Sequence, residues 1–227
     1  MSLHRRFIGV VLLALLVALF EGCASGPPPT DIELGEQALA RGDWRQARTH
    51  FSIALKKDPR AGRAWLGQAR AQIDGRDPES ALRSLSSLAK VDRERFSGEG
   101  RPVYANALHE ATVARLSQGQ SQAALVTARA LAKLEPERRG LDRVLGEAIL
   151  AEASRFRLRG NREAAFALYQ EAAQVVPQRL EGWLGAAEIL IESNRGRVAV
   201  RLLQAAREYH PTSGEIRMLS IQAVSAR

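Results

Sequence analysis

The chain has 227 residues and a formal net charge of +8; 45% of its residues are hydrophobic, 5% are aromatic, and one is a cysteine. A single cysteine excludes an intramolecular disulfide, so the fold depends on packing alone. The basic excess is compatible with nucleic-acid binding, but the arginines are distributed along the whole chain and no nucleic-acid-binding module accompanies them. We therefore expect a surface that attracts anionic lipid headgroups or an acidic protein, and no nucleic-acid partner.

Residues 1–22 have the features of a secretory signal peptide, because two arginines near the start precede an apolar run that ends at Phe20. This run is shorter than the roughly 20 apolar residues of a transmembrane helix. Gly22 and Cys23 follow, and they resemble the end of a bacterial lipobox. The resemblance implies that Cys23 is acylated and becomes the mature N-terminus, and that the protein is delivered to the outer membrane. The alternative is ordinary signal cleavage after Ala24.

Residues 23–30 include three consecutive prolines and form an extended tether between the cysteine and the first helix. Thr30 and Glu33 have the spacing of a capping box, which opens that helix. Beyond it, Ala, Leu, Arg and Glu dominate, and the sustained alternation that is typical of strands is missing. The sequence predicts an all-α fold, with helices at about 31–41, 44–57, 61–74, 78–90, 102–118, 121–134, 140–159, 162–175, 181–193 and 196–209.

One motif recurs along the chain. The turn at Gly42-Asp43 is followed by a small residue, Ala47, then by a large apolar residue, Phe51, and finally by Pro59. The small residue lets two helix backbones approach closely, and the large residue fills the space between them. The equivalent small residues are Ala47, Ala81, Ala124, Ala165 and Ala199, at spacings of 34, 43, 41 and 34 residues.

This motif and its period resemble the tetratricopeptide repeat (TPR). Trp65 and Trp183 occupy the tryptophan position of that family in the second and fifth copies. The resemblance implies a right-handed superhelix, an α-solenoid of about five helix-turn-helix repeats over residues 31–211. Residues 212–227 are expected to form a capping helix, which shields the exposed face of the last repeat.

Three details depart from or extend this pattern. Residues 93–102 are polar and glycine-rich, and we expect them to form a loop between the second and third repeats. Gln68 and Glu152 stand where the family packs apolar side chains. Thr212 and Glu215 have the spacing of a second capping box, which opens the final helix.

The residues that catalysis requires are not brought together by any pattern in the sequence. No pair among the four histidines has metal-ligand spacing, and the one cysteine is assigned to lipidation. Nucleophile elbows, phosphate-binding loops and dinucleotide fingerprints are not found. We therefore expect no enzyme, no small-molecule substrate and no cofactor or metal, apart from the lipid on Cys23.

In the TPR family, the first helix of each repeat lines the concave side of the superhelix. Alignment of the repeats implies a peptide-binding groove there, in which apolar side chains provide affinity and Arg63, Arg70 and Arg157 pair with acidic groups of a partner. The alternative is that its apolar members complete the packing between repeats while its charged members are solvated. The groove residues predicted in this way are Ile32, Glu36, Arg63, Leu66, Arg70, Asn106, His109, Val113, Leu150, Ser154, Arg157, Leu184, Glu188 and Ile191.

An outer-membrane lipoprotein built from such repeats resembles the pilotins and the assembly lipoproteins of type IV and Tad (tight adherence) pilus systems, including the TadD-like proteins. The resemblance implies a periplasm-facing scaffold that binds an outer-membrane secretin subunit or another pilus or secretion component. One alternative is a lipoprotein of the outer-membrane β-barrel assembly machinery. Another is a lipoprotein that regulates or tethers a peptidoglycan enzyme.

Overall fold

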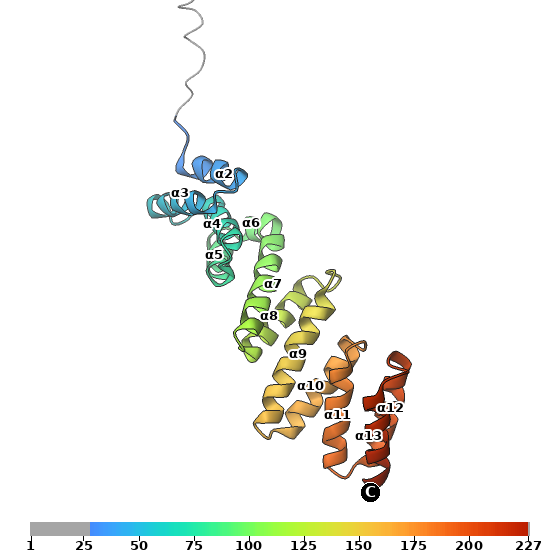
Figure 1. Cartoon of the computed structure of the whole chain (residues 1–227). Helices are drawn as coiled ribbons and strands as arrows, with labels where there is room; N and C mark the ends of the chain where they lie inside the picture. Colours follow the sequence, from blue (N-terminus) through green and yellow to red (C-terminus); the bar gives the residue numbers. More distant parts are fainter. Residues whose placement is uncertain (1–27, 227) are drawn as a thin grey trace, which may run out of the picture.

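A computed structural model describes residues 28–226, which form an elongated array of helices (Figure 1). The predicted signal peptide, Cys23 and most of the tether lie outside the described residues. Within residues 28–226 the regular structure is entirely helical. The elements are α2 (Asp31–Ala40), α3 (Trp44–Lys57), α4 (Gly62–Asp74), α5 (Pro78–Val91), α6 (Arg93–Arg95), the π-helix η1 (Phe96–Gly100), α7 (Arg101–Ser117), α8 (Ser121–Leu134), α9 (Leu141–Leu158), α10 (Arg162–Val175), α11 (Leu180–Glu192), α12 (Gly196–Tyr209) and α13 (Gly214–Ser225).

The helices pair in chain order: α2 with α3, α4 with α5, α7 with α8, α9 with α10, and α11 with α12. Each pair packs on the next, and α13 packs on α11 and α12. The first helices also contact one another directly, α2 with α4, α4 with α7 and α7 with α9. They therefore form the inner row of the superhelix, and the second helices form the outer row. The predicted all-α solenoid is confirmed.

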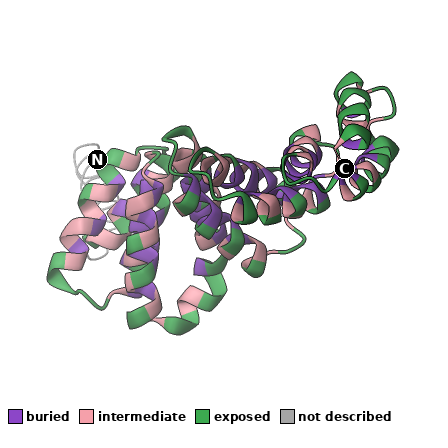
Figure 2. Ribbon diagram, turned by 90° about the horizontal axis from the view of Figure 1, so that it is seen from below, coloured by how far each residue is buried: buried purple, intermediate pink, exposed green. Residues whose placement is uncertain are grey.

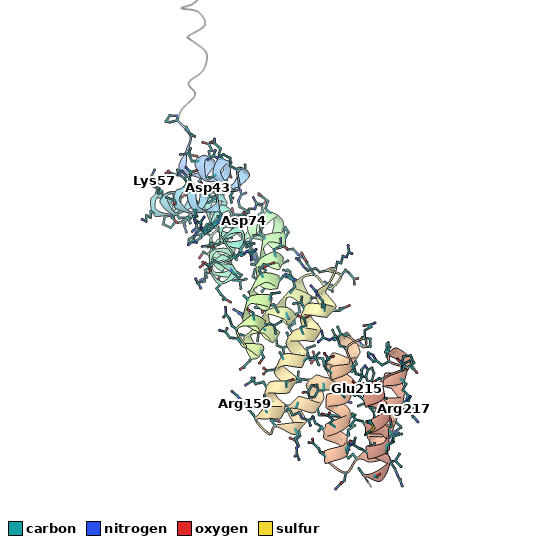
Figure 3. The ribbon with its side chains drawn as sticks, viewed as in Figure 1. Asp43, Lys57, Asp74, Arg159, Glu215 and Arg217 are labelled. Carbon is teal, nitrogen blue, oxygen red and sulfur yellow. The ribbon has the colours of Figure 1, made fainter. Side chains whose placement is uncertain are left out.

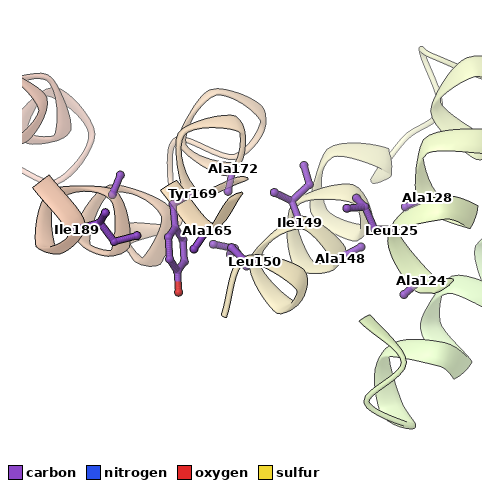
Figure 4. Close-up of a cluster of buried hydrophobic side chains, with 12 residues drawn as sticks. Ala124, Leu125, Ala128, Ala148, Ile149, Leu150, Ala165, Tyr169, Ala172 and Ile189 are labelled. Atoms are coloured by element: carbon purple, nitrogen blue, oxygen red, sulfur yellow. The ribbon is translucent and has the colours of Figure 1, made fainter. Parts of the chain in front are cut away.

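The recurring alanines lie where the two helices of each repeat cross. Ala47, Ala81, Ala124, Ala165 and Ala199 are all fully buried. Large side chains one turn further along fill the adjacent space: Phe51 in α3, Leu85 in α5, Tyr169 in α10 and Leu203 in α12. Figure 4 shows one such cluster, in which Tyr169 lies beside Ala165 and Leu150. Because each repeat shares its core with its neighbours, buried residues run along the length of the solenoid (Figure 2).

The first repeat follows the capping rules that the sequence predicts. Thr30 and Glu33 form the capping box of α2, in which the Thr30 N–H donates to the Glu33 carboxylate at 2.7 Å. Gly42 has φ +75°, a left-handed conformation that glycine adopts at little cost. Asp43 then caps α3 by accepting the Gln46 N–H at 2.9 Å.

The predicted loop at 93–102 is wrong, because these residues are helical. Asp92 caps α6 by accepting the Arg95 N–H at 2.9 Å, and Arg95 also pairs with Glu99 at 2.6 Å. The Phe96 ring lies 5.5 Å from the Tyr104 ring, so the segment has an apolar contact as well. As a result α6, η1 and α7 run on without an intervening loop, and the extra residues between the second and third repeats lengthen the first helix of the third repeat.

The final helix begins slightly later than the capping box at Thr212 predicts. The residue that caps α13 is Ser213, whose hydroxyl accepts the Ile216 N–H at 3.2 Å. Ile216 and Ala223 are buried against the last repeat, so α13 covers it as expected. α13 also exposes large apolar side chains, since Met218 and Ile221 are about 60% exposed.

Candidate protein-binding surfaces

Part of the predicted groove belongs to the core. Leu66 is 1% exposed and Leu150 is 8% exposed, so neither side chain is accessible to a partner, and the prediction that they bind one is wrong. Three further apolar members are partly buried against core clusters: Ile32, Leu184 and Ile191. Among the apolar groove residues, Val113 remains, and it is 44% exposed. Most of the apolar groove residues therefore complete the packing between repeats, which is the alternative that the sequence left open.

The charged groove residues join neighbouring repeats. Arg63 on α4 donates to Glu36 on α2 through Nε at 2.6 Å and through a second nitrogen at 2.5 Å. This bidentate pair raises the pKa of Arg63 above its ordinary value, chiefly through the hydrogen bonds to Glu36. Arg157 on α9 pairs with Glu188 at 3.0 Å and donates to Glu192 at 2.7 Å, both on α11. These arginines already have acidic partners inside the molecule.

The remaining polar groove residues also have contacts within the chain. Arg70 lies 3.9 Å from Glu99, and the His109 ring lies 3.5 Å from the Glu110 carboxylate. The Asn106 side chain accepts from Arg138 at 2.7 Å, and the Ser154 hydroxyl lies 3.3 Å from that of Tyr169. The inner row thus carries polar links both within and between repeats, and the structure does not gather the predicted residues into an apolar trough.

The two polar residues at apolar positions have partners in the interior. Gln68 donates to the Ser52 hydroxyl at 3.4 Å. The Glu152 carboxylate, whose residue is 3% exposed, accepts from Ser121 at 2.6 Å and from Arg155 Nε at 2.7 Å. The hydrogen bonds from Arg155 hold the pKa of the Glu152 carboxyl below its ordinary value, although burial acts in the opposite direction. The repeat period identifies these two residues as polar side chains at core positions, but it does not predict which side chains form hydrogen bonds with them.

A hollow that the sequence does not predict lies on the outer row. We call it the outer cleft. It has a volume of about 370 Å3 and lies between α5 and α8, next to the first half of α7. Apolar atoms dominate its walls, and the Phe96 and Tyr104 rings lie side by side at its edge. It depends on η1, because Phe96 comes from that segment. Its lining residues are Leu82, Ser86, Ala89, Phe96, Tyr104, Leu108, Val126, Thr127 and Ala130.

A second hollow of about 550 Å3 lies on the other side of Val126, around the turn between α7 and α8. Arg115 and Arg155 line it together with residues 119–123. Arg115 donates to the Glu79 carboxylate through two nitrogens, at 2.8 and 2.9 Å, so its charge is paired. Val126 separates the two hollows and is 64% exposed, which makes it the most accessible apolar residue of this surface.

Over residues 28–226, histidine, cysteine, aspartate and glutamate side chains form no group of three or more that could hold a metal ion. No helix in the same range is long and apolar enough to cross a membrane.

Two models of the tetratricopeptide repeat family match the chain, over residues 32–109 and 157–223. Together they cover more than half of the sequence, and the chain belongs to the tetratricopeptide repeat family. The curated proteins include no match to it. The fold and the family together define a scaffold of a kind that binds other proteins.

The chain is similar to several solved structures. The TPR protein BF2334 from Bacteroides fragilis is 15% identical over 87% of this chain and 97% of its own, with a TM-score of 0.60. MamA from Desulfovibrio magneticus RS-1 is 14% identical over 84% and 99%, with a TM-score of 0.41. The thermophilic TPR protein TTC0263 from Thermus thermophilus is 22% identical over 86% and 97%, with a TM-score of 0.35. At these identities the likeness to BF2334 shows the fold and no more.

Proposed function

We propose that this TPR protein is a non-enzymatic scaffold, anchored to the outer membrane by a lipid on Cys23, that helps to assemble or localise an outer-membrane secretin of a pilus or secretion system. The outer cleft carries the proposal, because it is an accessible apolar hollow on a repeat fold suited to protein binding. The combination of an export signal, Cys23 and repeats supports the location and the partner.

The outer cleft suits a partner better than the inner row does. Arg63 and Arg157, on the inner row, pair with glutamates of the neighbouring repeats, so an acidic partner would have to displace those glutamates. The outer cleft offers apolar walls and two aromatic rings without that competition. Apolar side chains of a short helical or extended segment are the chemistry that such a hollow recognises.

Val126→Glu is expected to weaken binding at least tenfold, because it places a carboxylate where the partner's apolar side chains would be desolvated. The measurement is a fluorescence titration of the protein with peptides that tile the periplasmic domain of a secretin subunit. Val113→Glu is the matched control: it makes the same change on the inner row, at a residue that is also exposed.

Three outcomes of this titration contradict the proposal in different ways. If Val113→Glu weakens binding and Val126→Glu does not, the inner row is the binding surface. If neither variant changes the affinity, the partner binds elsewhere. If the unaltered protein binds no secretin segment but binds a β-barrel precursor or a cell-wall synthase, the scaffold serves one of those systems.

The lipid anchor has its own test. Cys23→Ser is expected to remove the protein from the membrane fraction, because serine does not form the thioether that carries the lipid. Mass spectrometry of the unaltered protein should find a mature N-terminus at Cys23 with attached acyl chains. A mature N-terminus beyond Cys23 would overturn the anchor and leave the binding surface untouched.

A further inference from the structure

The outer face of α3 bears a cationic stripe. Four of the basic residues of the first repeat lie on this helix, and α3 contains no acidic residue. Arg45, Arg48 and Lys56, with Trp44, line an open groove of about 440 Å3 that runs along the helix. Asp43 and Lys57 mark the two ends of α3 in Figure 3. We call Trp44, Arg45, Arg48 and Lys56 the α3 stripe.

The charges of the α3 stripe are not neutralised as those of the inner row are. Within residues 28–226, no carboxylate lies within ion-pair distance of Arg45, Arg48 or Lys56. The nearby acidic residues serve as helix caps: Asp43 accepts from Gln46 at 2.9 Å, and Asp77 accepts from Ser80 at 3.1 Å. Although burial raises the pKa of the Asp77 carboxyl, hydrogen bonds from Ser80 and the charge of Arg48 lower it below its ordinary value, so the charge of Arg48 is partly balanced. Arg45 and Lys56 are exposed, and the stripe presents a net positive charge to whatever lies outside it.

Trp44 holds two of these charges in place. The Arg45 guanidinium lies 4.3 Å and the Arg48 guanidinium 5.9 Å from the ring centroid, within the range of cation–π contacts. The ring itself packs against the second repeat at the end of α4, since a side chain added at Gly75 would lie 2.8 Å from it. An aromatic ring with adjacent arginines has the amphipathic character of residues that lie at membrane interfaces.

The position of the stripe in the chain identifies its occupant. Residues 24–30 alone separate Cys23 from α2, and seven extended residues span at most about 25 Å. A lipid on Cys23 would hold α3 close to the bilayer at an effective concentration in the range of roughly millimolar, so a weak affinity for headgroups suffices. We propose that the α3 stripe binds the phosphate groups of an anionic phospholipid surface and so fixes the direction in which the solenoid leaves the membrane. This proposal rests on the proposed anchor.

The test uses the mature chain from residue 23 with Cys23→Ser, which keeps every described helix and has no lipid. It is mixed with vesicles of phosphatidylethanolamine and phosphatidylglycerol, or with vesicles of phosphatidylethanolamine and phosphatidylcholine, and binding is measured by co-sedimentation. We expect binding to the phosphatidylglycerol vesicles only, reduced by added salt. The variant Arg45→Gln/Arg48→Gln/Lys56→Gln should bind on the order of 100-fold more weakly, because each basic residue near an anionic surface contributes about fivefold.

The matched control is Arg197→Gln/Arg201→Gln/Arg207→Gln, which removes the same charge from exposed positions on α12 at the other end of the solenoid. This control should retain its binding; an equal loss would mean that net charge alone attracts the protein, and would overturn the proposal. The variant Arg45→Lys/Arg48→Lys keeps the charge and should bind, which covers the case in which the glutamine variant misfolds.

Two further results would also overturn the proposal that the α3 stripe binds anionic phospholipid. One is the absence of binding to phosphatidylglycerol vesicles at roughly millimolar lipid, the effective concentration that the anchor would provide. The other is tighter binding of the stripe to polyglutamate than to vesicles, which would assign it to an acidic protein instead. Neither result would affect the mass of the mature N-terminus or the secretin titration, so failure of this inference is separable from failure of the proposed function.

Discussion

Replacing Gly196 with alanine is expected to displace α13 from the end of the solenoid. Gly196 begins α12, and a side chain there would overlap the carbonyl oxygens of Ala223 and Ala226. Both obstacles are backbone, which does not rotate away, so the C-terminal part of α13 has to move. Overpacking of this kind costs about 1–3 kcal/mol of stability. Hydrogen exchange should show faster exchange in α13, with a lower melting temperature.

Gly214→Ala is the control for this change. Gly214 is the first residue of α13, and a side chain there would meet nothing within 4 Å. This substitution should leave the melting temperature unchanged or raise it slightly, because it lowers the entropy of the unfolded chain. If both variants behave alike, the contact of α13 with α12 is not the constraint that we describe.

Phe51→Ala is expected to lower the free energy of unfolding by about 3–5 kcal/mol, the range for large aromatic deletions in a core. Phe51 is fully buried on α3, and its ring lies against Gly35 on α2 and Gly67 on α4. The ring therefore fills the space between the first and second repeats, and the rigid helices around it leave a cavity. Urea unfolding followed by circular dichroism measures the change.

Leu158→Ala removes a large apolar side chain that is 89% exposed, and it should change the stability little. A small effect of Phe51→Ala, comparable to that of Leu158→Ala, would mean that the first repeats repack around the missing ring. The period that places Phe51 at the centre of the repeat would then be misassigned.

The repeat itself was predictable because its signals are local. Ala47 and Phe51 are four residues apart on one helix face, and Gly42 with Asp43 marks the turn before them; each of these is a property of a few adjacent residues. Trp65 and Trp183 have equivalent roles, since each indole donates to the carbonyl of a proline six residues earlier at 2.9 Å. Because the same residue roles recur in several repeats, the sequence gives several independent indications of each role.

The binding surface was less predictable because it depends on contacts between repeats. The sequence places Arg63 on the inner row, but its pairing with Glu36 depends on how α4 packs against α2. The segment at 93–102 has the composition of a loop, and its helix is stabilised by Asp92 and by the contact of Phe96 with Tyr104. Phe96 of this helical segment lines the outer cleft. Because its composition assigns the segment to a loop, the sequence does not predict the cleft.

The pairing of neighbouring helices has a consequence for how the chain folds. Each described helix packs on helices of its own repeat or of the next one. Contacts between residues close in sequence require only short loops to close, and proteins rich in them fold quickly. Each repeat can therefore form once its two helices and one neighbour are available, so growth from a folded pair of repeats proceeds in either direction along the chain.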